Sequence, residues 1–87
     1  MAYYKDEGQL TIYYNVSDNE EFITLIEEWK NHRTKEVDYY VLQHLSPTNG
    51  RFDILAKEGI LKLQQITKKE WNSVVSSLKD FVNGGDQ

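Results

Sequence analysis

Three side chains of this sequence have the types that nucleophilic catalysis requires: His44, Ser46 and Asp53. A histidine can act as the base, a serine hydroxyl as the nucleophile, and a carboxylate as the group that orients the histidine. The strands expected at residues 36–45 and 51–56 would form a hairpin that brings the three side chains near one another. However, the sequence has no nucleophile-elbow motif and no glycine cluster that could form an oxyanion hole. We therefore predict that the protein is not an enzyme.

Metal and cofactor binding have as little support in the sequence. The two histidines, His32 and His44, lack a second ligand at a helical metal-binding spacing, and the chain has no cysteine. No glycine-rich loop follows an expected strand, so nothing indicates a phosphate cradle. The prediction is that no cofactor or metal is bound.

Length and composition restrict the class of protein. With 87 residues and no internal repeat, the chain has room for one hydrophobic core, so residues 1–87 should form a single domain with flexible ends at 1–8 and 84–87. No stretch approaches the roughly 18 apolar residues of a membrane span. The absence of cysteine suits a reducing compartment. We expect a cytoplasmic protein that does not enter a membrane.

Two capping boxes indicate where helices should begin. In this motif a serine or threonine hydroxyl accepts the backbone N–H three residues on, and a glutamate binds back to the cap's own N–H. The motif occurs at residues 17–20 and again at residues 67–70. Apolar residues at helical spacing follow each box. The first set is Phe22, Leu25, Ile26 and Trp29, which predicts a helix ending near Arg33. The second set is Trp71, Val74, Val75, Leu78 and Val82, which predicts a helix ending at Gly84.

Alternating and β-branched segments predict four strands, at residues 9–16, 36–45, 51–56 and 60–66. The expected order is β-α-β-β-β-α, an α+β fold with a four-stranded, mostly antiparallel sheet. Because two apolar helix stripes must be buried against one sheet, both helices should pack on the same face. Trp29 and Trp71 are expected to lie close together in that core.

This arrangement leaves the other face of the sheet open. Alternation along the strands places an apolar and aromatic group there, consisting of Tyr13, Tyr40, Leu42 and Leu55. Such a patch, surrounded by polar groups, is typical of a protein interface, although tyrosines are also common on solvated strands. A one-residue error in the register of residues 36–45 would exchange the two faces of that strand.

A second candidate surface is the acidic side of the first expected helix, formed by Glu20, Glu21, Glu27 and Glu28. A compact acidic face can attract a basic partner, as a mimic of nucleic acid would. The ordinary alternative is a solvated helix face with favourable negative charge near its N-terminus.

These patterns predict a small non-enzymatic protein-binding or regulatory module, an adaptor or inhibitor of the kind that phages and mobile elements encode. Its partner would be another protein or a second copy of the chain, giving a homodimer. The alternative is a single-stranded nucleic-acid-binding domain, in which Tyr13 and Tyr40 stack on bases and Arg51, Lys57 and Lys62 contact phosphates. The net charge of −4 argues against nucleic acid, because phosphate binding needs a positive surface.

Overall fold

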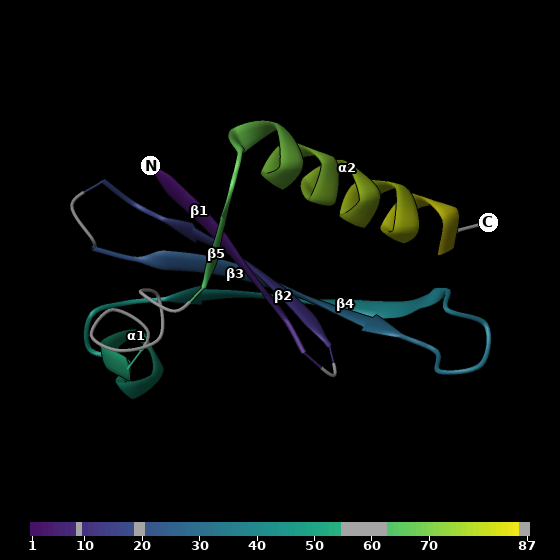
Figure 1. Ribbon diagram of the computed structural model, residues 1–87, viewed down its shortest axis with the longest axis horizontal. Coiled ribbons are helices and arrows are strands. Elements are labelled where there is room, and N and C mark those ends of the chain that lie inside the picture. The colour runs from purple at the N-terminus through teal and green to yellow at the C-terminus, as the bar shows by residue number, and fades with distance from the viewer. Residues whose placement is uncertain (9, 19–20, 55–62, 86–87) are drawn as a thin grey trace.

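The computed structural model describes residues 1–8, 10–18, 21–54 and 63–85. It contains an antiparallel five-stranded sheet and two helices (Figure 1), which confirms the predicted α+β class with five strands in place of four. The elements are β1 (Ala2–Glu7), β2 (Thr11–Val16), β3 (Ile23–Lys30), β4 (Val37–Leu45), α1 (Gly50–Ile54), β5 (Gln64–Ile66) and α2 (Lys68–Gly85).

The strand order across the sheet is β4-β3-β2-β1-β5. Strands β1 to β4 form a meander in which each strand pairs with the next. The chain then returns to the far side of the sheet, where β5 pairs with β1 and Ile66 lies opposite Tyr3. Consequently β4 and β5 are the two edge strands.

Alternation along the strands gives the sheet two faces, and each is covered by a different helix. On the α1 face, Tyr14 lies opposite Leu25; on the α2 face, Tyr13 lies opposite Ile26. The two helices are on opposite sides of the sheet (Figure 1). The prediction that both helices pack on one face is therefore wrong.

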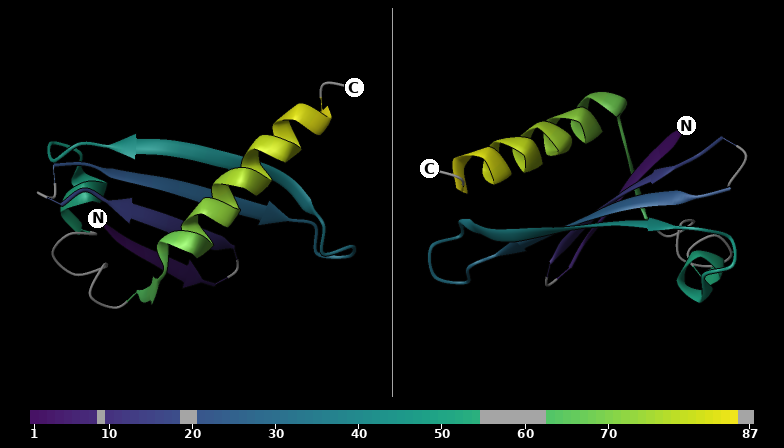
Figure 2. Two further views of the ribbon diagram at one scale, coloured as in Figure 1. Left: turned by 90° about the horizontal axis from the view of Figure 1, so that it is seen from above. Right: turned by 180° about the vertical axis from the view of Figure 1, so that it is seen from behind.

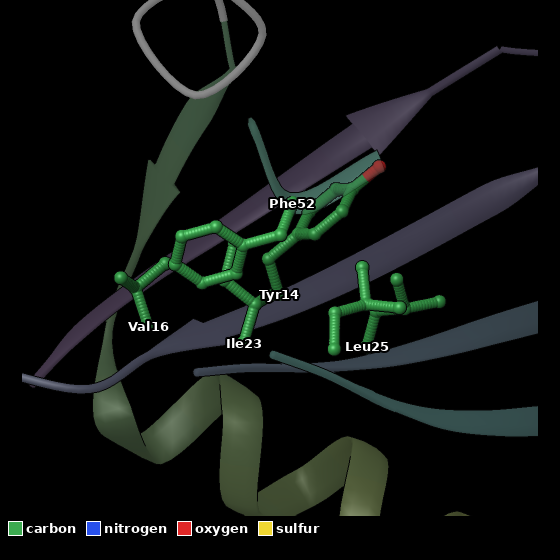
Figure 3. Packing of buried hydrophobic residues seen from close by; sticks show 6 residues of the cluster. Tyr14, Val16, Ile23, Leu25 and Phe52 are labelled. Carbon is green, nitrogen blue, oxygen red and sulfur yellow. The ribbon is translucent and has the colours of Figure 1, made fainter. Parts of the chain in front are cut away.

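Buried apolar side chains on the α1 face form one core cluster (Figure 3). Phe52 of the short helix α1 packs there against Tyr14 of β2 and the fully buried Ile23 and Leu25 of β3. Val16 and Leu45 complete the buried part of the cluster.

A second cluster lies between the sheet and α2. Trp71 and Val74 of the helix pack with Ile26 and Ile66 of the sheet, and the ring of Tyr3 lies 6.0 Å from that of Trp71. Helix α2 crosses the sheet diagonally from the β5 side to the β4 side, and its last turn reaches past β4 (Figure 2, left). Because Trp29 lies on the other face, the expected proximity of the two tryptophans is also wrong.

The segment that was expected to be the first helix is strand β3. A strand in the middle of a sheet that is covered on both faces needs apolar residues on both sides, so it shows no simple alternation. Ile23 and Leu25 are buried on one face and Ile26 on the other. This run of apolar residues imitates a helical spacing, and the β-branched Ile23, Thr24 and Ile26 favour the strand.

The first capping box does not cap a helix. Ser17 instead closes the connection between β2 and β3, because its backbone N–H donates to the carbonyl of Phe22 and its hydroxyl accepts the N–H of Phe22. Residues 19 and 20 lie outside the described residues.

Helix α1 replaces the strand that was expected at residues 51–56, of which 55 and 56 lie outside the described residues. Asn49 acts as the N-cap, since its side-chain oxygen accepts the N–H of Arg51 at 2.8 Å. Asn49 and Gly50, which lie between the two strands of the expected hairpin, therefore begin a helix. At the N-terminus, residues 2–7 form β1, where a flexible end was expected.

The second capping box is confirmed in its main features. The N–H of Glu70 donates to the hydroxyl of Thr67 at 3.1 Å, and α2 begins at Lys68. Ile66 and Trp71, on either side of the cap, are buried in one cluster, as a hydrophobic staple requires. Val82, expected on the buried stripe, is exposed.

Candidate functional site

Strand β4 forms a long open edge of the sheet. It has nine residues, VDYYVLQHL, and its outer side pairs with no strand within the described part of the chain. Proteins commonly protect such edges with short strands, lysines, prolines or bulges. The other edge strand, β5, has only three residues. In β4 the register is irregular only near Val37, and the remainder, residues 39–45, contains no lysine, arginine or proline.

Exposed apolar side chains gather at this edge. Among the described residues, six large hydrophobic side chains are exposed, and four of these belong to β4 or to the part of α2 that reaches it. We call these four the β4 edge surface: Tyr39 (48% exposed), Leu42 (50%), Phe81 (40%) and Val82 (55%). Tyr39 lies on the α1 face and Leu42 on the α2 face, so the four residues border the edge on both faces of the sheet. Exposed apolar residues that share one edge mark an interaction site more often than isolated ones do.

On the α2 face, Tyr40 joins this surface to the protein interior. Its ring lies 5.5 Å from that of Phe81 in an edge-to-face arrangement. Its hydroxyl donates to Glu28 at 3.2 Å, and Glu28 also forms an ion pair with Lys30 at 3.3 Å. Burial and, next, the negative charge of Glu28 raise the pKa of Tyr40 to about 12. These contacts fix the end of α2 against β4.

The raised pKa of Tyr40 predicts a loss of stability in strong base. The unfolded tyrosine has a pKa near 10.0, so between pH 10 and about 12 the unfolded chain releases this proton before the folded chain does. Stability should therefore be constant with respect to this group below pH 10 and fall as the pH rises through that window. Urea denaturation at a series of pH values should show a shallower fall for Tyr40→Phe than for the wild type. Equal slopes would contradict the assignment to Tyr40.

On the α1 face, Trp29 and Tyr39 stack beside the same edge. Their ring centroids are 5.5 Å apart and their planes differ by 13°. The indole N–H of Trp29 donates to Glu27 at 3.1 Å, and a guanidinium nitrogen of Arg51 lies 3.9 Å from the other Glu27 oxygen. The sequence pattern placed Trp29 in a helix core, whereas the strand puts it on a partly open face.

The predicted open-face residues are brought together but are mostly covered. Tyr13, Tyr40 and Leu42 share one face of the sheet, as the alternation indicated. That face is the one on which α2 packs, so Tyr13 and Tyr40 lie in the second core cluster, and burial raises the pKa of Tyr13. Only Leu42 of the three is exposed, while Leu55 lies outside the described residues.

The predicted acidic helix surface does not exist in this fold. Glu27 and Glu28 are neighbours on a strand and therefore point to opposite faces. Both are largely covered, Glu27 next to Arg51 and Glu28 next to Lys30. Glu21 is exposed before β3 begins, and Glu20 lies outside the described residues.

The catalytic and metal candidates do not assemble either. His44 lies on the α2 face, where its ring nitrogen Nδ1 is 3.0 Å from the hydroxyl of Thr24, and Ser46 bonds to Thr48 at 2.9 Å. Within the described residues, no group of three or more His, Asp or Glu side chains could hold a metal ion. A hollow of about 200 Å³ lies near Gly8, Lys30 and Lys35. It is smaller than the roughly 300–1,000 Å³ of typical small-molecule pockets.

Comparison of the chain with protein-family models, with curated proteins and with solved structures finds no match. In the described part of the chain, no helix combines the length and the apolar character needed to span a membrane.

Proposed function

We propose that this protein is a small non-enzymatic interaction module that binds another polypeptide by accepting a strand along β4. The observation that carries the proposal is the coincidence of a long open edge with four exposed apolar side chains beside it. The small size and the absence of cysteine suit an adaptor or inhibitor in a reducing cytoplasm, such as those of phages and mobile elements.

Binding by strand addition requires unpaired backbone groups and accessible side chains at the same edge of the sheet. An added strand gains main-chain hydrogen bonds, and its alternate side chains contact the two faces of the sheet. Here Tyr39 and Val41 would receive them on the α1 face, and Leu42 on the α2 face. The overhanging end of α2, with Phe81 and Val82, would cover the added strand from above (Figure 2).

The test is to place a charge on the edge without changing the core. Leu42→Lys puts a lysine where an added strand would pack, which is how natural edges avoid pairing. The matched control is Gln65→Lys, on the exposed side of the opposite edge strand β5. Association of the protein, with itself or with a partner captured by cross-linking in the source cell, should fall at least tenfold in the first variant and stay unchanged in the control.

Two results would contradict the proposal. One is a wild-type protein that associates with no polypeptide, and the other is an equal effect of both lysine variants. Circular dichroism of each variant shows whether the fold is intact, and Leu42 is half exposed, so its replacement should leave the spectrum unchanged.

No specific observation favours the nucleic-acid alternative. Tyr13 and Tyr40, the residues expected to stack on bases, are partly covered by α2. Arg51, expected at a phosphate, lies next to Glu27. Lys57 and Lys62 are outside the described residues. With a net charge of −4, the chain also lacks the positive field that gives phosphate binding its salt dependence.

A further inference from the structure

We infer that the polypeptide accepted by β4 is a second copy of this chain, paired antiparallel about a two-fold axis at Leu42. The inference rests on the proposed function and names its partner. The two five-stranded sheets would then join, through their β4 strands, into one continuous sheet with both α2 helices on the same face. An isologous contact of this type requires a surface that is complementary to itself.

The regular part of β4 is centred on Leu42. Because the register irregularity lies near Val37, the undistorted residues are 39–45, whose midpoint is Leu42. Full overlap of two such segments places Leu42 opposite Leu42 of the second copy, and Tyr40 opposite His44 of the second copy. The most exposed large apolar side chain of β4 is thus buried by its own counterpart.

Charge favours the same register. Asp38 and His44 are the only acidic and basic residues of β4 apart from its tyrosines. With Leu42 on the axis, neither Asp38 nor His44 lies opposite its own counterpart in the second copy. Registers that place Asp38 opposite Asp38, or His44 opposite His44, would bring identical groups together and shorten the overlap. The central residues, 39–43, carry no charged group, as is usual in the core of an interface.

The helices also fit this register. Phe81 packs on Tyr40, so the position of α2 follows that of Tyr40. With Leu42 on the axis, the two Tyr40 residues are four positions apart along the paired strands, or about 13 Å at 3.3 Å per residue. Packed helices need about 8–10 Å between their axes, so the two helices do not collide. The last turn of each, which reaches past β4, can instead cover the strand of the other copy (Figure 2).

The chain has no cysteine, which allows a direct test of the register. Leu42→Cys places two thiols opposite each other, where Cα atoms about 4.5–5.5 Å apart suit a disulfide. His44→Cys is the matched control: it lies on the same strand and the same face, but its two copies would be about 13 Å apart, too far to bridge. Under mild oxidation, Leu42→Cys should form covalent dimers at least tenfold faster than His44→Cys. Light scattering should show that the wild type is a dimer and that Leu42→Lys is a monomer.

A wild-type protein that is monomeric over the whole concentration range, or equal disulfide rates for the two cysteine variants, would overturn the inference. The proposed function would survive this result if a different polypeptide were still captured by the wild type and lost in Leu42→Lys. Loss of that capture together with a monomeric wild type would overturn both.

Discussion

Replacement of Ile23 by alanine is expected to cost about 2–5 kcal/mol of stability, because Ile23 is fully buried and packs on Phe52 and Leu25 between β2 and β4. A chain of this length has about 4–13 kcal/mol in total. With a urea m value of about 1 kcal/mol per molar, the denaturation midpoint should fall by about 2 M or more, which circular dichroism can follow.

The matched control is the neighbouring residue, Phe22. The helical spacing assigned Phe22 to the core, whereas in the structure its side chain is 47% exposed. Phe22→Ala should therefore cost less than about 1 kcal/mol although it removes the larger side chain. If Phe22→Ala were the more harmful of the two, residues 23–30 would not form the strand described.

Replacement of Trp71 by alanine is expected to have the second large effect, about 3–5 kcal/mol. Trp71 anchors the first turn of α2, where it packs with Ile66, Ile26 and the ring of Tyr3. Its loss opens a cavity under the helix and removes half of the hydrophobic staple. Thermal denaturation followed by circular dichroism should show a lower melting temperature and a loss of helical signal.

Trp29→Ala provides the comparison, because the same residue type lies there on the partly open α1 face. Its stacking on Tyr39 is worth about 0.5–1.5 kcal/mol beyond burial, so a loss of about 1–2 kcal/mol is expected. Equal losses for the two tryptophan variants would contradict the difference in burial between Trp71 and Trp29.

The parts of the fold that depend on local chemistry could be predicted from the sequence. The start of helix α2 is indicated by the cap bond between Thr67 and Glu70 and by the staple of Ile66 and Trp71. Both interactions are made by residues close together in the chain. Strands β2 and β4 were also located, since alternation is visible along a single strand.

Strand β3 could not be recognised from local pattern, because its environment is set by the rest of the sheet. Only when β2 and β4 flank it, with a helix on each face, does a run such as Ile23, Leu25 and Ile26 become buried on both sides. Leu25 and Ile26, taken with Phe22 and Trp29, also have the i, i+3, i+4, i+7 spacing of a helix. The two occurrences of the capping box differ for the same reason, since the hydroxyl of Ser17 accepts the N–H of Phe22, the residue before β3, whereas that of Thr67 accepts the N–H of Glu70 in α2.

The candidate site was likewise predictable from the sequence only in part. Alternation correctly placed Tyr13, Tyr40 and Leu42 on one face, yet it could not show which face α2 would cover. That β4 is an edge strand follows from strand order, which in turn depends on the pairing of β5 with β1. The exposure of Phe81 and Val82 depends on how far α2 extends past the sheet.

The pairing of β5 with β1 also determines the order in which the chain can fold. Strands β1 to β4 pair with their neighbours through short connections, whereas Tyr3 pairs with Ile66, which is far from it in the sequence. A contact between residues far apart in the sequence requires the long segment between them to become ordered before any packing is gained. The hairpins should therefore form first, and residues 63–85 should dock after them. During synthesis, residues 63–85 leave the ribosome after β1 to β4, and until they do, Ile26 and Tyr13 lack the helix that covers them. During that interval the nascent chain exposes an apolar, aggregation-prone surface that α2 covers in the folded protein.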